Sequence, residues 1–251
     1  NVALDATYSL GPNLSGVGVY SRRILAAVAG AHPEAELLFC YRPRRFLASL
    51  GKALPSNCRR RLLLDVHPPR AALFHGLNQR LPQGRLGRAV STFHDLFVLT
   101  GEYSTPEFRR RFAAQARDAA RRSDLIIAVS EFTAAQVRGL LGVESARIRV
   151  VPHGVRPLPV PLCAREKIIL HVGAVQARKN IVRLVEAFEG AAPGWRLVLA
   201  GGFGFGAEAI RERIEASPRR TDIRLLGYVP EQQLWRLYAR YAETHRYKVE
   251  L

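Results

Sequence analysis

The chain has 251 residues, 48% of them hydrophobic and 24% charged, so it can bury a core and is not mainly disordered. No apolar run approaches the roughly 20 residues of a membrane-spanning helix, and residues 1–5 lack the basic and apolar pattern of a secretory signal. The cysteines are far apart and form no CxxC pattern, which argues against a disulfide framework or zinc site and favours a cytoplasmic protein: Cys40, Cys58 and Cys163.

The formal net charge of +17 indicates an anionic partner. All but four of the 38 basic residues are arginines, and they are scattered in twos and threes without interleaved aromatic residues that could stack on bases. We therefore expect no nucleic-acid site. Attraction to acidic lipid head groups is the better interpretation of the charge, so we expect peripheral association with the inner face of an anionic membrane.

Short apolar runs alternate with helical patterns along residues 1–155. Thr105, Pro106 and Glu107 supply a hydroxyl cap, a proline at the first helical position and an acid in the first turn, which predicts a helix start. Strands that alternate with helices form a parallel sheet covered on both faces. The pattern predicts strands at 2–6, 36–41, 71–74, 89–93, 125–129 and 148–151, and helices at 17–29, 106–122 and 131–141.

A proline-rich stretch without periodicity follows, and we interpret residues 156–166 as a linker between a domain at 1–155 and a domain at 167–251. The second domain restarts the alternation of strand and helix but shows only three strands, so we expect it to be incomplete. Its predicted strands are 168–172, 196–200 and 223–226, and its predicted helices are 180–189, 207–216 and 231–240.

A glycine-rich loop at residues 11–18 follows the first strand and opens the first helix. Glycines let the backbone approach a ligand, and the free amides of a helix start point toward an anion. A turn that only needs a positive φ would show the same pattern, so this loop by itself leaves both interpretations open.

Another loop follows the first strand of the second domain and brings Arg178 and Lys179 to the start of a helix. Cations at that end oppose the helix dipole, which disfavours a merely solvated basic pair. A bound anion would offset the cost. An ammonium, a guanidinium and free amides at one place suit a diphosphate leaving group.

Two further features stand at strand ends, where loops supply functional groups. The glycine loop at 201–206 follows one predicted strand, and His94 follows another. A lone histidine at such a position is as often structural as functional. Because tandem domains of this class bind ligands at the carboxyl ends of their strands, we expect both features to face a cleft between the domains.

Six motifs stand in a specific order along residues 2–240: GVGVYSRRI at 16–24, TFHDL at 92–96, SDLIIAVSEFT at 123–133, VPHGV at 151–155, HVG with RKNI within 171–181, and LGYVPE at 226–231. In this order and spacing they resemble the family-4 retaining glycosyltransferases of the GT-B fold. The resemblance implies two Rossmann-like, doubly wound α/β domains with parallel sheets, an N-terminal domain on the acceptor side and a C-terminal donor domain.

The resemblance also implies a reaction. A sugar would move from a nucleotide diphosphate sugar to a glycan or lipid-linked acceptor, with retention and with neither a metal nor another cofactor. Catalytic positions of the family match His94, Lys179 and Arg178. Donor-binding positions match Gly16, Gly18, Gly173, Gly201, Gly202, Tyr228 and Val229.

The sequence departs from the family in three places. Ala174 stands where many members have an arginine, the paired glutamates of an EGFGLPxLE-like segment are absent, and residues 241–251 match nothing expected. We therefore expect an inactive fragment. The strand at 168–172, which lacks the charges and prolines that blunt an edge, is expected to lie at a bare sheet edge and to promote self-association.

The Arg-Lys-Asn motif at 178–180 favours GDP-mannose as the donor. Two alternatives stay open. A nucleotide-sugar epimerase of the same fold would need an acidic and histidine set that we do not locate. A basic adaptor for nucleic acid or membrane would show salt-sensitive binding without nucleotide dependence.

Overall fold

The computed structural model describes residues 1–155, 157, 159, 161 and 164–240. Parts of the predicted linker at 156–166, and the whole unexpected stretch at 241–251, lie outside the described residues. The chain divides into two compact units, Asn1–Gly154 and Val155–Leu251. Among the described residues, no helix combines the length and the apolar character needed to cross a membrane.

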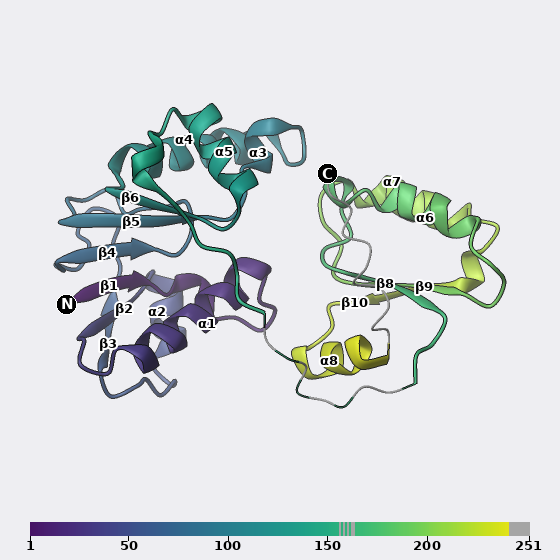
Figure 1. Ribbon diagram of the computed structural model, residues 1–251, viewed down its shortest axis with the longest axis horizontal. Coiled ribbons are helices and arrows are strands. Elements are labelled where there is room, and N and C mark those ends of the chain that lie inside the picture. Colours follow the sequence, from purple (N-terminus) through teal and green to yellow (C-terminus); the bar gives the residue numbers. More distant parts are fainter. Residues whose placement is uncertain (156, 158, 160, 162–163, 241–251) are drawn as a thin grey trace. The chain divides into compact units, whose positions relative to one another are not determined.

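The first unit is built on a seven-stranded parallel sheet of order β3-β2-β1-β4-β5-β6-β7. Figure 1 shows α1 and α2 on one side of this sheet and α4 and α5 on the other. The strands are β1 (Val2–Asp5), β2 (Leu37–Tyr41), β3 (Cys58–Leu62), β4 (Leu73–Gly76), β5 (Arg88–Phe93), β6 (Leu125–Ala128) and β7 (Ile148–Val150).

Both faces of this sheet are buried, as the alternation predicts. Neighbouring residues of β1 enter different cores: Leu4 packs with residues of α1, and Ala3 belongs to the core that α4 and α5 share. The expected caps are present, since the Thr105 side chain accepts a hydrogen bond from the Phe108 amide at 3.3 Å. The helices of this unit are α1 (Gly16–Ala31), α2 (Pro43–Ser49), α3 (Phe97–Thr100), α4 (Pro106–Arg122) and α5 (Glu131–Leu141), with 3-10 turns at Thr7–Ser9 and Ser145–Arg147.

Sequence patterning misses β3, α2 and α3. The β3 strand contains three consecutive arginines, Arg59 to Arg61, which do not fit a buried parallel strand. They are tolerated because β3 lies at the sheet edge, where its one partner strand among the described residues is β2 and charged side chains reach solvent. The two helices are too short for a helical period to be visible in the sequence.

The second unit contains a three-stranded parallel sheet of order β10-β9-β8. Within the described residues β8 therefore lies at an edge, as expected. Its Ile168 and Leu170 are nevertheless buried, because Val229, Leu237 and Tyr238 pack over them. The elements are β8 (Ile168–Val172), α6 (Ile181–Glu189), β9 (Arg196–Ala200), α7 (Ala207–Glu215), β10 (Ile223–Gly227) and α8 (Glu231–Arg240), with 3-10 turns η3 (Ala177–Lys179) and η4 (Arg220–Asp222).

Candidate functional site

Three aromatic rings meet at the carboxyl edge of the first unit's sheet. His94 follows the last residue of β5, His153 lies three residues beyond β7, and Tyr20 is in the second turn of α1. The Tyr20 and His94 ring centroids are 4.7 Å apart and nearly perpendicular at 78°. His153 lies 4.9 Å from Tyr20 and stacks on His94 at 5.4 Å. Parallel strands end on one edge, so segments far apart in sequence form one cluster.

The hydrogen bonds of His94 determine its tautomer. Its Nε2 lies 3.0 Å from the Leu77 carbonyl oxygen, and a carbonyl can only accept, so Nε2 carries the proton. The lone pair of the neutral ring is then on Nδ1. Burial lowers the pKa of His94, and the neighbouring His153 lowers it further, whereas the Leu77 bond and Asp95 act in the opposite direction. The ring is therefore a neutral hydrogen-bond acceptor at neutral pH.

A polar chain lies behind this cluster. The buried Thr92 hydroxyl is 2.9 Å from Nε2 of His75 and 3.3 Å from the Tyr20 hydroxyl. Burial lowers the pKa of His75 to about 4 and raises the pKa of Tyr20, so both are neutral near pH 7. Thr92 thus fixes the Tyr20 ring, whose edge-to-face contact in turn orients His94.

The two predicted glycines of the first loop differ in what requires them. A Cβ on Gly18 would lie 2.8 Å from the Tyr8 carbonyl oxygen, so the chain's own packing demands glycine there. A Cβ on Gly16 would meet nothing within 4 Å. Gly16 is the first residue of α1, directly after the N-cap Ser15, and it is exposed.

In the second unit, the predicted cations lie on η3, immediately before α6. We name residues 173–180 the cationic loop. Gly173 begins it with a φ of 143°, and Asn180 ends it in the left-handed region with a φ of 53°, so the chain turns sharply at both ends. Lys179 is exposed. Burial lowers the pKa of His171, and the charge of Lys179 lowers it further.

The glycine loop at 201–206 supports the cationic loop from behind. Backbone amides join them: Val175 donates to Gly202 at 2.9 Å and Gly204 donates to Val175 at 3.0 Å. A Cβ on Gly201 would lie 1.7 Å from the Gly173 carbonyl oxygen, so glycine at 201 lets the two backbones touch. A Cβ on Gly202 would meet nothing within 4 Å. Of these two predicted donor-binding glycines, Gly201 is required by packing, whereas Gly202 has free space where a side chain would begin.

The other predicted donor residues follow β10. The Tyr228 side chain is exposed, whereas Val229 packs against the core over β8 and β9. The structure therefore gathers the predicted residues into two groups, His94 with the first loop in one unit and the remainder in the other. Sequence reasoning did not nominate Tyr20, His75, Thr92 or His153. Their common signal is a position at or near the carboxyl end of a strand or the start of α1.

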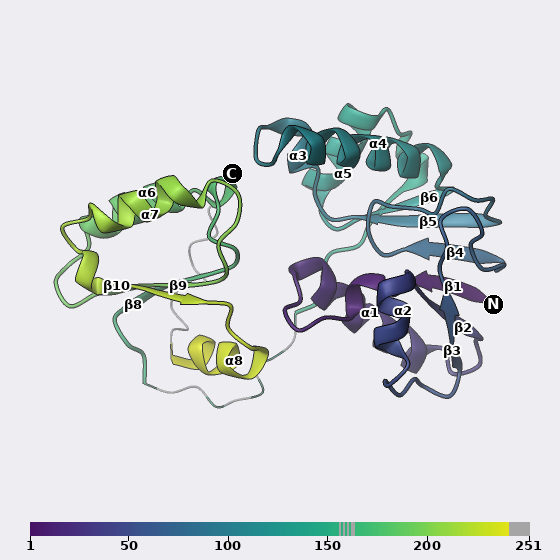
Figure 2. The same ribbon diagram turned by 180° about the vertical axis from the view of Figure 1, so that it is seen from behind.

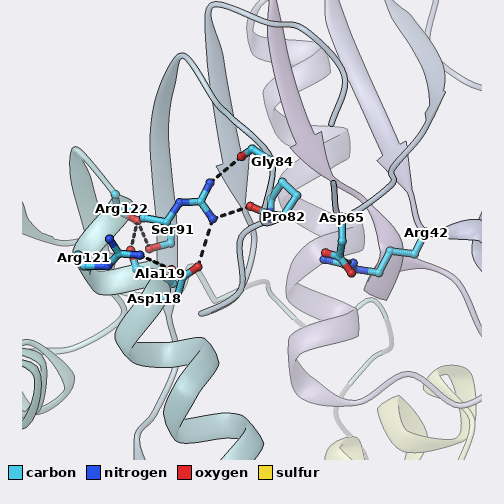
Figure 3. A network of polar contacts seen from close by, with 10 residues as sticks. Arg42, Asp65, Pro82, Gly84, Ser91, Asp118, Ala119, Arg121 and Arg122 are labelled. Carbon is cyan, nitrogen blue, oxygen red and sulfur yellow. Dashed lines mark hydrogen bonds and ion pairs between the residues drawn. The ribbon is translucent and has the colours of Figure 1, made fainter. Parts of the chain in front are cut away.

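A cavity of about 460 Å³ in the first unit is separate from this cluster. It is lined by α4 and by residues near Arg80, and its charges pair with one another. Arg80 bonds Asp65 at 3.0 Å, and Arg122 bonds Asp118 at 3.2 Å. Figure 3 shows the Arg122 guanidinium also reaching the carbonyls of Pro82 and Gly84, so this network ties the end of α4 to a turn. Among the described residues no cluster of metal-ligating side chains occurs.

Family models match the two compact units of the chain separately. A family model described as Glycosyltransferase Family 4 matches residues 16–157, and one described as Glycosyl transferases group 1 matches residues 161–244. The chain is 27% identical to the O-antigen chain mannosyltransferase B of Escherichia coli over 271 residues, covering 90% of this chain and 71% of that protein.

Solved structures show the same fold at low identity. Sucrose-phosphate synthase from Thermosynechococcus elongatus matches with a TM-score of 0.69 at 19% identity, over 96% of this chain and 73% of that one. WaaG, a glycosyltransferase involved in lipopolysaccharide biosynthesis, matches with a TM-score of 0.67 at 15% identity and the same coverage. Anabaena Alr3699/HepE in complex with UDP matches with a TM-score of 0.59 at 13% identity, over 95% and 71%.

Proposed function

The chain belongs to Glycosyltransferase Family 4, and from this premise we propose that it serves the transfer of a sugar, with retention, from a nucleotide diphosphate sugar to a hydroxyl of a glycan or lipid-linked acceptor. The membership favours a transferase over an epimerase of the same fold. The proposal assigns the diphosphate to the cationic loop and the sugar and acceptor hydroxyl to the His94 cluster.

The cationic loop is the observation that carries the proposal. Departure of a nucleoside diphosphate leaves negative charge on its oxygens, and the barrier falls when fixed cations and amides stabilise that charge. Arg178 and Lys179 stand at the start of α6, where the helix amides add to the positive potential. Backbone bonds to residues 202–205 hold the loop, so little reorganisation is needed when charge develops. In this proposal neither a metal nor another cofactor takes part.

His94 acts on the uncharged part of the reaction. A neutral Nδ1 lone pair accepts a hydrogen bond from a sugar or acceptor hydroxyl, and it adds no positive charge beside an anomeric carbon that becomes cation-like. Packing against Tyr20 and His153 holds the ring in that orientation. A histidine in this state orients a hydroxyl without being protonated itself.

We propose GDP-mannose as the donor. Two observations support it: the Arg-Lys-Asn motif at 178–180, and a relative at 27% identity that is a mannosyltransferase. The solved neighbour Alr3699/HepE binds UDP, at 13% identity. UDP is therefore the nucleotide against which the proposal is tested.

Calorimetric titration of the 251-residue chain with GDP, UDP and GMP tests the assignment. Binding is the readout because the assignment concerns the contacts of the diphosphate with the cationic loop. GDP should bind at least about tenfold more tightly than GMP, since one charge-assisted contact contributes roughly 1.5–3 kcal/mol. Lys179→Gln should remove most of that difference.

Arg183→Gln is the matched control, because Arg183 is an exposed cation on α6 just beyond the loop. It should leave GDP binding within about twofold. Equal losses in both variants would assign the effect to general positive charge and overturn the diphosphate site. Tighter binding of UDP than of GDP would overturn the GDP-mannose assignment alone.

A further inference from the structure

Residues 42–64 carry a larger share of the positive charge than their share of the chain's length. This segment holds seven arginines and lysines and no aspartate or glutamate. It also contains several of the exposed large hydrophobic residues of the first unit. Cationic and apolar side chains on one surface are the composition of interfacial binding sites rather than of a purely solvated face.

The α2 helix presents part of this composition outward. Phe46 packs against the core beneath it. Arg44, Leu47 and Leu50 follow one another at intervals of three residues, which places them on one side of the helix. Leu47 is 70% exposed and Leu50 is 56% exposed. An amphipathic helix on the surface of a globular domain normally turns its leucines toward the core.

The edge strand β3 continues the same surface. Arg60 and Leu62 pair in register with Phe39 and Tyr41, whose side chains lie on the α2 side of the sheet. The Arg60 guanidinium donates to the Lys52 carbonyl at 2.6 Å, which joins strand and helix. Figure 2 shows α2 in front of β2 and β3, and the two strands contact it. We call Arg44, Leu47, Leu50, Lys52, Arg60 and Leu62 the α2–β3 surface.

We propose that the α2–β3 surface binds a bilayer of anionic phospholipids, with Leu47 and Leu50 inserted among the acyl chains and the cations at the head groups. Lipid fits better than nucleic acid because the exposed apolar residues are aliphatic and offer no ring for a base to stack on. Each cation near an anionic membrane adds to binding, and each inserted leucine removes apolar area from water. The surface acts independently of sugar transfer.

Flotation of the purified 251-residue chain with vesicles tests the proposal. Vesicles of phosphatidylcholine containing phosphatidylglycerol should bind the chain at least about tenfold more strongly than phosphatidylcholine alone. The double variant Leu47→Ser/Leu50→Ser should weaken binding by about tenfold or more. Arg44→Gln/Lys52→Gln should have a similar effect, and added salt should abolish what charge contributes.

Two matched controls separate this surface from the general charge of the molecule. Phe132→Ser/Leu140→Ser removes two exposed apolar residues of α5, and Arg111→Gln/Arg117→Gln removes two exposed cations of α4. Both should bind vesicles as the unchanged chain does. Circular dichroism verifies that every variant is folded.

Four results would overturn the proposal. Equal binding to both kinds of vesicle would contradict the preference for anionic lipid. Full binding by the leucine double variant would contradict insertion of Leu47 and Leu50. Equal losses in the α4 and α2 charge variants assign the binding to the net charge of +17. A single-stranded RNA that binds as tightly as the vesicles and is unaffected by the leucine variant would identify a nucleic-acid surface instead.

Discussion

In the first unit the candidate groups are neutral rings packed against one another, whereas in the second they are cations on a loop held by backbone hydrogen bonds. Burial suppresses protonation of His75 and His94, so the first cluster is suited to hydroxyls. The cationic loop keeps Lys179 exposed, so it is suited to an anion. A reaction that moves an uncharged sugar away from a charged diphosphate needs both environments.

The largest effect is expected where the second site depends on backbone contact. Gly201→Ala places a methyl group 1.7 Å from the Gly173 carbonyl oxygen, so the two loops must separate. We expect this to lower the free energy of unfolding of the second unit by at least about 3 kcal/mol. Tryptophan fluorescence measures it selectively, since both tryptophans, Trp195 and Trp235, belong to this unit.

Gly202→Ala is the control, because its Cβ meets nothing within 4 Å. It should change the stability by no more than about 0.5 kcal/mol. If both glycines respond alike, the distinction between a supporting and an open glycine is wrong.

The next prediction concerns the pH dependence of stability, which should differ between the two units because His75 lies in the first. The pKa of His75 is about 4 in the folded chain, and the ordinary value is 6.5. As the pH falls below the ordinary value, the unfolded state takes up a proton that the folded state refuses, so stability falls with pH down to about 4. The loss is about 3 kcal/mol. Urea unfolding followed by circular dichroism at several pH values should show it.

His75→Gln removes this titration and keeps a group that can bond Thr92. The slope of its unfolding free energy against pH should be smaller over that range, by the equivalent of up to about one proton taken up on unfolding. The tryptophan-detected unfolding of the second unit should be unchanged by the substitution. An identical pH dependence in the variant would show that His75 is not the titrating group.

Much of both units was predictable, because alternating strands and helices leave a periodic pattern. The helix at 106–122 and the strands at 168–172 and 196–200 match the prediction residue for residue. Their caps and buried runs are local features. In contrast, β3 is defined by its place at an edge, which no local pattern records.

The candidate site was predictable only in part for a related reason. His94 and Lys179 belong to motifs, whereas the contact of Tyr20 with His153 joins segments more than a hundred residues apart and depends on strand order. The role of Gly201 was equally hidden, since a glycine that admits a ligand and one that admits another backbone look the same in a sequence.

A smaller effect tests whether the polar chain holds the ring cluster. Thr92→Val keeps the shape of the buried side chain but leaves His75 Nε2 and the Tyr20 hydroxyl without their shared partner. We expect a loss of about 2 kcal/mol in the stability of the first unit. The nitrogen chemical shifts of His94 should also change, because the Tyr20 ring is less restrained.

Tyr20→Phe is the matched variant, since it removes only the 3.3 Å bond and keeps the ring. Its loss should be about 1 kcal/mol or less. A Thr92→Val variant with unchanged stability and unchanged His94 shifts would show that the hydrogen bonds of Thr92 do not hold the ring cluster.

The smallest effect sharpens the comparison most, because stability and binding should move in opposite directions. Gly16→Ala adds a methyl group that meets nothing within 4 Å at the first position of α1, where alanine restricts the unfolded chain more than glycine does. We expect the first unit to gain up to about 1 kcal/mol in unfolding measured by circular dichroism. Gly18→Ala should instead destabilise it by about 1–3 kcal/mol, through the contact with the Tyr8 carbonyl. If the open backbone at Gly16 serves the donor phosphates, the more stable variant should bind GDP more weakly in calorimetry. A gain in stability with full GDP affinity would reduce Gly16 to a residue of the helix start and leave the diphosphate to the cationic loop alone.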